Sequence, residues 1–562
     1  MKKLTLVVCA LFIAQGLSAQ VWVPMTNDLL NLESFRHQAT TVIEDDLDNG
    51  IDGTDIFYVD GARIYTNLSN LATGMEQQAN NSNSANTVLL GATSPVYKGW
   101  KVTAFYGNAN LESTTFDGMI GETSFVGLPS NPEFSTRDFL LMDSTASAEL
   151  SQNTVLLNIG KVMGRGTEVA FTYKRERSSS KGEFEDSMYY IDETLDPPNI
   201  TELYYGAENG SYDNSTPVTT YALSYSKPYR GWKLRGDVFL SSTTEQNSEE
   251  ISGFYFEDLL PGSPNTTFTT RDTTTMMDQY DYSGNIAGIG LRLSDENQYG
   301  LLWEIGGNFG MIFGSGDANE DNNYHLITQS EMVADQIGVL DSLYSSDWTA
   351  ALSVSGNAMG LNGRMEWQIA ENVRFGLGCM FNSFSATIEE DRTYRLDITS
   401  SYDDDDGTAS DADDYDLTVN GYDIDETYTQ GISANRIAVP AGIEVNFGKN
   451  KDWFLRLGAL AVGSKTEYTD ETVTDSISVY ERVIEYGNGA EVESYGTNVT
   501  YEDGKVTSGG TSQAVYYTYG LGWKPSKNLS LDLIGMFDAS GVELLSTDWL
   551  RSLKLSATIN IY

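Results

Sequence analysis

The chain has 562 residues, of which 34 are Lys or Arg and 80 are Asp or Glu, so its formal net charge is −46. This acidic balance excludes nucleic acid as a partner, because phosphate binding requires a basic surface. Aromatic residues make up 11% of the chain, Gly is abundant and only 12 Pro occur, a composition that argues against disorder.

The chain begins with a pattern typical of a secretory signal peptide. Lys2 and Lys3 precede an apolar core from Leu4 to Ala14, and Ala19 supplies a small residue at the expected cleavage site. We therefore expect residues 1–19 to be removed on export.

The exported chain has few cysteines and no apolar helix. Cys9 lies in the signal peptide, which leaves Cys379 alone in the mature chain and excludes an intrachain disulfide. No later stretch reaches the ~18 apolar residues of a membrane helix. If the mature protein crosses a membrane, it must therefore do so with strands.

Residues 20–61 precede the first strand pattern, and we expect them to form a periplasmic, plug-like segment. The stretch that follows contains Tyr65, Asn67, Leu71 and Ala72 in an aromatic–x–Asn–x–x–x–Leu–Ala arrangement.

This stretch, residues 60–72, resembles the N-terminal motif of the FadL-type outer-membrane transporters for long-chain fatty acids and aromatic hydrocarbons. Leu68 stands where that family has its hallmark proline. The resemblance implies a barrel with an N-terminal hatch, from Val21 to Ala72, and passage of apolar solutes. The family usually has fourteen strands.

The rest of the chain is typical of repeated β-hairpins. Short turn signals recur at intervals of roughly 65 to 80 residues, each between segments of alternating polarity. Trp232, Leu234 and Val238, for example, alternate with Lys233 and Arg235. An aliphatic face and a charged face on one strand suit a lipid-facing wall around a wet interior. The seven turns centre on Lys98-Gly99, Gly164-Arg165-Gly166, Tyr229-Arg230-Gly231, Asp295-Glu296-Asn297, Glu371-Asn372, Lys449-Asn450-Lys451 and Ser526-Lys527-Asn528.

Seven hairpins give fourteen strands, and segments 63–72 and 549–562 add one strand each. We therefore predict an all-β fold for residues 62–562: a transmembrane antiparallel up-and-down barrel of about 16 strands, within a range of 14–18. Short turns would face the periplasm. Long extracellular loops would span the polar segments 113–151, 178–216, 244–283, 314–350, 389–431 and 468–511.

The last strand carries a further signal. Leu553, Leu555 and Ile559 alternate with polar residues, and the chain stops at Tyr562. This resembles the terminal strand that the outer-membrane assembly machinery recognises, although Asn560 stands where that pattern has an apolar residue. The predicted location is the outer membrane of a Gram-negative bacterium, in contact with its lipid.

Charged residues on the polar face are candidates for a lumen wall. Opposed charges there would either select solutes in an aqueous pore or form ion pairs that stiffen the wall beneath a plug. A pair such as Arg364 and Glu366 fits both interpretations. The candidates are Lys101, Lys233, Arg235, Asp237, Glu304, Arg364, Glu366, Arg374, Glu444, Arg456 and Asp532.

Acidic runs offer oxygen ligands that suit Ca²⁺, and no other cofactor is expected. Solvated, mutually repelling acidic surface is the simpler interpretation. Two shorter stretches have alternating oxygen ligands, but neither has the glutamate that would complete a calcium loop. The acidic run comprises Asp403, Asp404, Asp405, Asp406, Asp411, Asp413 and Asp414, and the shorter stretches are Asp46, Asp48, Asp52 and Asp55, and Asp317, Asn319 and Asp321.

Catalysis has little support. The chain has only two histidines, His37 in the N-terminal segment and His325 in a predicted loop, and neither falls on an alternating strand. We therefore expect no enzyme.

The functional prediction is an outer-membrane pore or transporter for passive passage of small solutes, resembling a porin. The alternatives are a FadL-type transporter of hydrophobic solutes and an adhesion or structural barrel acting through its acidic loops. A homo-oligomer is compatible with each. A receptor with about 22 strands and a plug domain is disfavoured, because such a fold would not fit this length.

Overall fold

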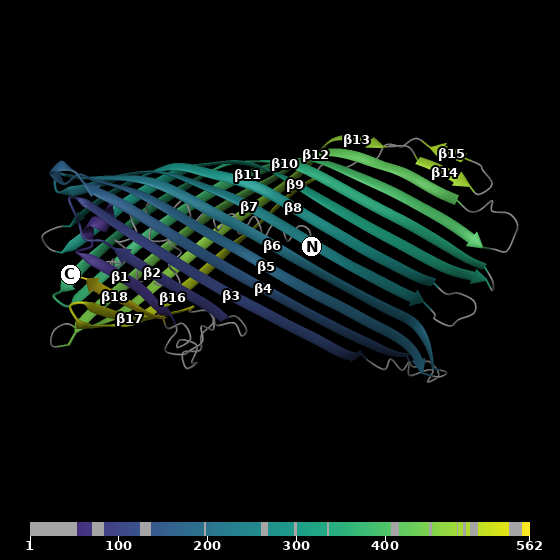
Figure 1. Ribbon diagram of the computed structural model, residues 1–562, viewed down its shortest axis with the longest axis horizontal. Helices are drawn as coiled ribbons and strands as arrows, with labels where there is room; N and C mark the ends of the chain where they lie inside the picture. Colours follow the sequence, from purple (N-terminus) through teal and green to yellow (C-terminus); the bar gives the residue numbers. More distant parts are fainter. Residues whose placement is uncertain are drawn as a thin grey trace.

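The computed structural model describes residues 53–69, 84–123, 136–195, 198–259, 268–296, 300–333, 336–405, 415–448, 452–479, 482–486, 491–494, 504–538 and 554–561. Within these residues, sixteen antiparallel strands form a closed barrel, whose shape Figure 1 shows. The sheet closes where β1 (Ala62–Ser69) pairs with both β2 (Ser84–Thr93) and β18 (Lys554–Ile561). The predicted all-β barrel and its strand number are therefore confirmed.

The remaining barrel strands follow one another in chain order around the wall. They are β3 (Trp100–Thr123), β4 (Thr136–Val162), β5 (Glu168–Leu195), β6 (Pro198–Tyr229), β7 (Trp232–Leu259), β8 (Phe268–Glu296), β9 (Leu301–Val333), β10 (Gln336–Ala370), β11 (Val373–Asp405), β12 (Tyr415–Phe447), β13 (Trp453–Val479), β16 (Gly504–Ser526) and β17 (Leu529–Asp538). The short hairpin of β14 (Arg482–Tyr486) and β15 (Glu491–Ser494) extends the sheet from β12, at the end of the barrel opposite the C-terminus (Figure 1).

A belt of apolar side chains covers the outside of the barrel beside the short turns. Leu291, Ile305 and Leu361 are 61%, 62% and 53% exposed, respectively. Trp453 and Trp523 stack at this end with ring centroids 5.4 Å apart. A belt of aliphatic residues with aromatic residues at its border is the lipid-facing surface of an outer-membrane barrel. Among the described residues, no helix is both long enough and apolar enough to cross a membrane.

Most of the segments predicted as long extracellular loops are strands, which corrects the sequence analysis. β10 alone has 35 residues, whereas about 9–11 residues cross a bilayer. Its outward face is apolar from Met359 to Ile369 and polar beyond, at Ser355 and Ser353. In water a paired strand needs no apolar outer face, so the loss of apolar alternation marks the edge of the membrane rather than the end of the strand.

The inner face is not uniformly polar, another difference from the expected wet interior. A buried apolar cluster runs along the inner face of β6 to β12. Its rings lie against glycines of adjacent strands: a Cβ at Gly288 would lie 2.3 Å from Phe239 Cζ. The cluster comprises Ala222, Phe239, Ile286, Ile312, Val354, Ala358, Phe384, Ala386 and Ile432.

Candidate functional site

A short piece of the N-terminal segment lies against the inner wall of the barrel. This 3₁₀ helix, η4 (Gly53–Tyr58), contacts β3, β4, β5 and β6. Ile56 and the following Val59 are fully buried. The close approach depends on Gly160 of β4, where a Cβ would lie 2.8 Å from Ile56 Cδ1.

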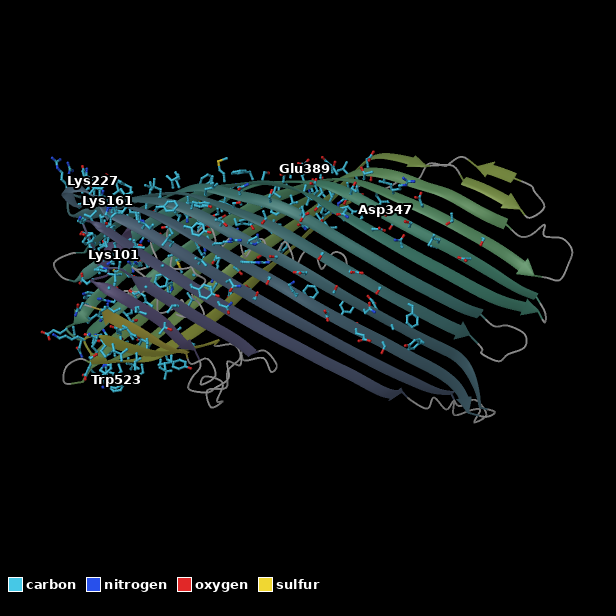
Figure 2. All side chains as sticks on the ribbon, viewed as in Figure 1. Lys101, Lys161, Lys227, Asp347, Glu389 and Trp523 are labelled. Atoms are coloured by element: carbon cyan, nitrogen blue, oxygen red, sulfur yellow. The ribbon has the colours of Figure 1, made fainter. Side chains whose placement is uncertain are left out.

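Wall side chains bind both ends of this piece, which we call the docked segment (residues 53–59). The Asn158 amide donates a hydrogen bond to the Gly53 carbonyl oxygen at 2.9 Å. The Lys101 ammonium donates one to the Val59 carbonyl oxygen. Figure 2 shows Lys101 at the same end of the barrel as Trp523, whereas Asp347 and Glu389 lie farther toward the opposite end. The docked segment therefore occupies the lumen at the end with the short turns.

Asp55 is the centre of the docking contact. Its Oδ2 accepts hydrogen bonds from Arg235 Nη1 at 3.1 Å and from Arg292 Nη1 at 2.9 Å. Lys233 Nζ lies 3.5 Å from Oδ1 and 3.9 Å from the centroid of the Tyr58 ring. Three cations from two strands thus converge on one carboxylate.

Two buried arginines of the wall face each other where Asp55 binds. Arg235 of β7 and Arg292 of β8 are direct cross-strand partners, and their side chains are nearly fully buried. Like charges directly opposite each other destabilise a sheet. Asp55 accepts from both guanidinium groups and removes that repulsion.

Each of the three cations is also held by a carboxylate of the wall. Arg235 Nε lies 2.8 Å from Asp237, Arg292 Nη1 lies 3.5 Å from Glu304, and Lys233 Nζ lies 3.0 Å from Glu168. Arg364 binds Glu304 from the far side at 3.2 Å. The positions of the cations are therefore fixed by the barrel and not by the docked segment alone.

The electrostatic environment keeps Asp55 ionised. Burial alone would raise the pKa of its carboxyl, but the charges of Arg292, Arg235, Lys233 and Arg364 outweigh burial and hold the pKa well below its ordinary value.

A second ion-pair network continues around the inner wall. Arg374 of β11 lies 3.1 Å from Glu366 of β10 and 2.6 Å from Glu444 of β12. Arg456 of β13 lies 2.8 Å from Glu444 and reaches Asp532 of β17 at 3.1 Å. Ion pairs thus cross the wall from β10 to β17.

All eleven candidate wall residues lie on the inner face: ten belong to these two networks, and Lys101 of β3 binds the docked segment. Arg364 and Glu366, the example pair from the sequence, do not bind each other: Arg364 binds Glu304 and Glu366 binds Arg374. Sequence reasoning missed Arg292, although Leu291 and Leu293 alternate with it and would have revealed its inward position.

The acidic stretches have different outcomes. Asp55 binds the wall cations, and Asp46, Asp48 and Asp52 lie outside the described residues. Asp317, Asn319 and Asp321 lie within β9 rather than in a loop.

The main acidic run is only partly described. Asp403, Asp404 and Asp405 end β11, and Asp406, Asp411, Asp413 and Asp414 fall outside the described residues. Within the part of the chain that the structure describes, no group of three or more His, Cys, Asp or Glu side chains could hold a metal ion. Calcium binding by the undescribed residues stays a prediction.

Two other sequence features can also be placed. His325 lies on β9 and not in the predicted loop, whereas His37 is outside the described residues. Tyr65 and Asn67 of the FadL-like stretch lie on β1, in a barrel with two strands more than that family usually has.

No protein-family model matches the sequence, and a search of curated proteins finds no match. Similar solved structures include a mutant of the ferric enterobactin receptor of Pseudomonas aeruginosa, with 10% identity, 89% of this chain and 80% of that chain covered, and a TM-score of 0.23. A siderophore receptor of Acinetobacter baumannii is 8% identical, with 89% of this chain and 80% of that chain covered and a TM-score of 0.22. The alcaligin outer-membrane receptor of Bordetella pertussis is 9% identical, with 89% of this chain and 75% of that chain covered and a TM-score of 0.17. Likeness at these TM-scores supports no statement about ligand or mechanism, and the comparisons give the FadL-type resemblance no support.

Proposed function

We propose that this protein is an outer-membrane transporter for small solutes, and that its own N-terminal segment closes the lumen at the periplasmic end. The observation that carries the proposal is the contact of Asp55 with Arg235 and Arg292 inside the barrel. A buried carboxylate held by two buried arginines is a specific contact, because these charge-assisted hydrogen bonds form only when the segment brings Asp55 to this position.

The barrel supports passage of solutes once this contact opens. Sixteen strands enclose a lumen wide enough for an aqueous path. The inner wall at this level carries polar and charged side chains, which suit water and hydrophilic solutes. The docked segment argues for a gated path in place of the permanently open pore expected from the sequence.

Conductance across planar lipid bilayers tests the proposal. Asp55→Lys places a fourth cation among Lys233, Arg235 and Arg292, so like-charge repulsion should expel the docked segment. We expect the unmodified protein to show little conductance and the variant to show large, steady steps. Asp60→Lys is the matched control, because Asp60 directly follows the docked segment and is exposed. Equal conductance of the unmodified protein and Asp55→Lys would contradict closure by the docked segment.

A second candidate function is passage of solutes with an apolar part. The buried apolar cluster on the inner face of β6 to β12 favours it, because a porin-type wall would be polar at that level. Uptake of a long-chain fatty acid, compared with uptake of a sugar of similar mass, discriminates between the two candidates. Preferential uptake of the sugar would exclude the second.

A further inference from the structure

Building on the proposed function, we infer that Lys233, Arg235 and Arg292 form a binding site for the carboxylate of a small solute that the barrel transports. Asp55 occupies this site as an internal substitute until the solute displaces it.

The geometry at Asp55 is that of a carboxylate receptor. Two guanidinium nitrogens share Oδ2, and the Lys233 ammonium approaches Oδ1, so both oxygens of the group are recognised. Arginines are well suited to planar carboxylates, and charge-assisted hydrogen bonds to them are strong. The wall thus recognises a carboxylate group, whichever molecule carries it.

The receptor persists when Asp55 leaves. Arg235 remains bound to Asp237, Arg292 to Glu304 and Lys233 to Glu168. Arg235 and Arg292 would then face each other across the strand pair without the anion between them. A vacated site therefore favours entry of another anion.

Asp55 competes with a free solute for the site because the docked segment holds its carboxylate close to the three cations. Besides Asp55, polar contacts from Asn158 and Lys101 hold the ends of the docked segment, and Ile56 packs at Gly160. A tethered group behaves like a ligand at roughly millimolar effective concentration. Free carboxylates should therefore bind the unmodified protein weakly and a variant without the Asp55 side chain more tightly.

Thermal unfolding of the refolded protein with acetate or acetamide tests this inference. Asp55→Ala removes the internal carboxylate, and acetamide is the uncharged analogue of acetate. At equal ionic strength, set with sodium chloride, acetate should raise the Tm of Asp55→Ala by a few degrees, and acetamide should not. The unmodified protein and the Asp60→Ala control should respond to neither at the same concentration. Adding Arg292→Gln to Asp55→Ala should abolish the acetate response.

Two further measurements define the class of ligand. Phosphate should raise the Tm of Asp55→Ala less than acetate does, because the three cations are placed around the two oxygens of a single carboxylate. In bilayers, acetate at high concentration should open the unmodified protein, and acetamide should not, which keeps the inference testable if Asp55→Ala does not fold.

Equal responses to acetate and acetamide, an acetate response that survives Arg292→Gln, or a stronger response to phosphate would each overturn the carboxylate site. These outcomes leave the proposed closure intact. Closure fails separately if Asp55→Lys does not increase conductance.

Discussion

At the scale of single residues, the central contact joins three parts of the chain that are distant in sequence. Asp55 is separated from Arg235 by 180 positions and from Arg292 by 237. Alternation along a strand indicates that Arg235 points inward, because neighbouring side chains take opposite faces. This alternation does not indicate which acidic residue pairs with Arg235. That partner depends on where the N-terminal segment lies, which no local pattern specifies.

The lowered pKa of Asp55 sets the pH range over which the barrel stays closed. The folded-state pKa of Asp55 lies below the ordinary pKa of about 3.9. The ion pairs of Asp55 therefore stabilise docking fully above pH ~3.9, and this stabilisation is lost only as the pH falls through the lower, folded-state pKa. Bilayer conductance of the unmodified protein should therefore stay low from pH 7 to about pH 4. Asp60→Asn should follow the same profile. Opening already near pH 6 would show that another group controls the segment.

At the scale of secondary-structure elements, the turns and the membrane-facing strands were predictable from sequence, but the strand ends were not. The turn signals at Lys98-Gly99 and Glu371-Asn372 separate β2 from β3 and β10 from β11. The apolar alternation of β10 ends at Met359, although the strand begins at Gln336. Apolar alternation reports lipid contact, so it could not reveal strands that continue into water.

Contacts between strands depend on glycines under aromatic rings. Phe454 of β13 is almost fully buried, and a Cβ at Gly522 of β16 would lie 1.8 Å from its Cζ. Gly522→Ala should therefore lower the free energy of unfolding by about 1–3 kcal/mol, the usual cost of overpacking. Gly510→Ala, on the same strand, is the matched control because a Cβ there meets nothing within 4 Å. Urea unfolding midpoints measure both, and equal midpoints would show that the Phe454 ring moves aside freely.

At the scale of the whole molecule, the barrel separates two environments. Near the short turns, an apolar belt surrounds an inner wall whose opposite charges pair with one another. Beyond the belt, the outer face carries exposed acids such as Asp317, Asp347 and Asp391. The net charge of −46 therefore includes an acidic exterior above the membrane, carried by strands in segments that the sequence predicts to be loops.

Because residues 53–59 lie docked inside the lumen with Ile56 fully buried, a side chain at position 56 should be protected from reagents in water. Cys379→Ser combined with Ile56→Cys leaves position 56 as the only thiol of the mature chain. In refolded protein, a water-soluble maleimide should label this thiol at least about tenfold more slowly than in the same protein carrying Asp55→Lys, because labelling requires local opening. Equal labelling rates with Asp55 and with Asp55→Lys would show that residues 53–59 are not docked in the lumen.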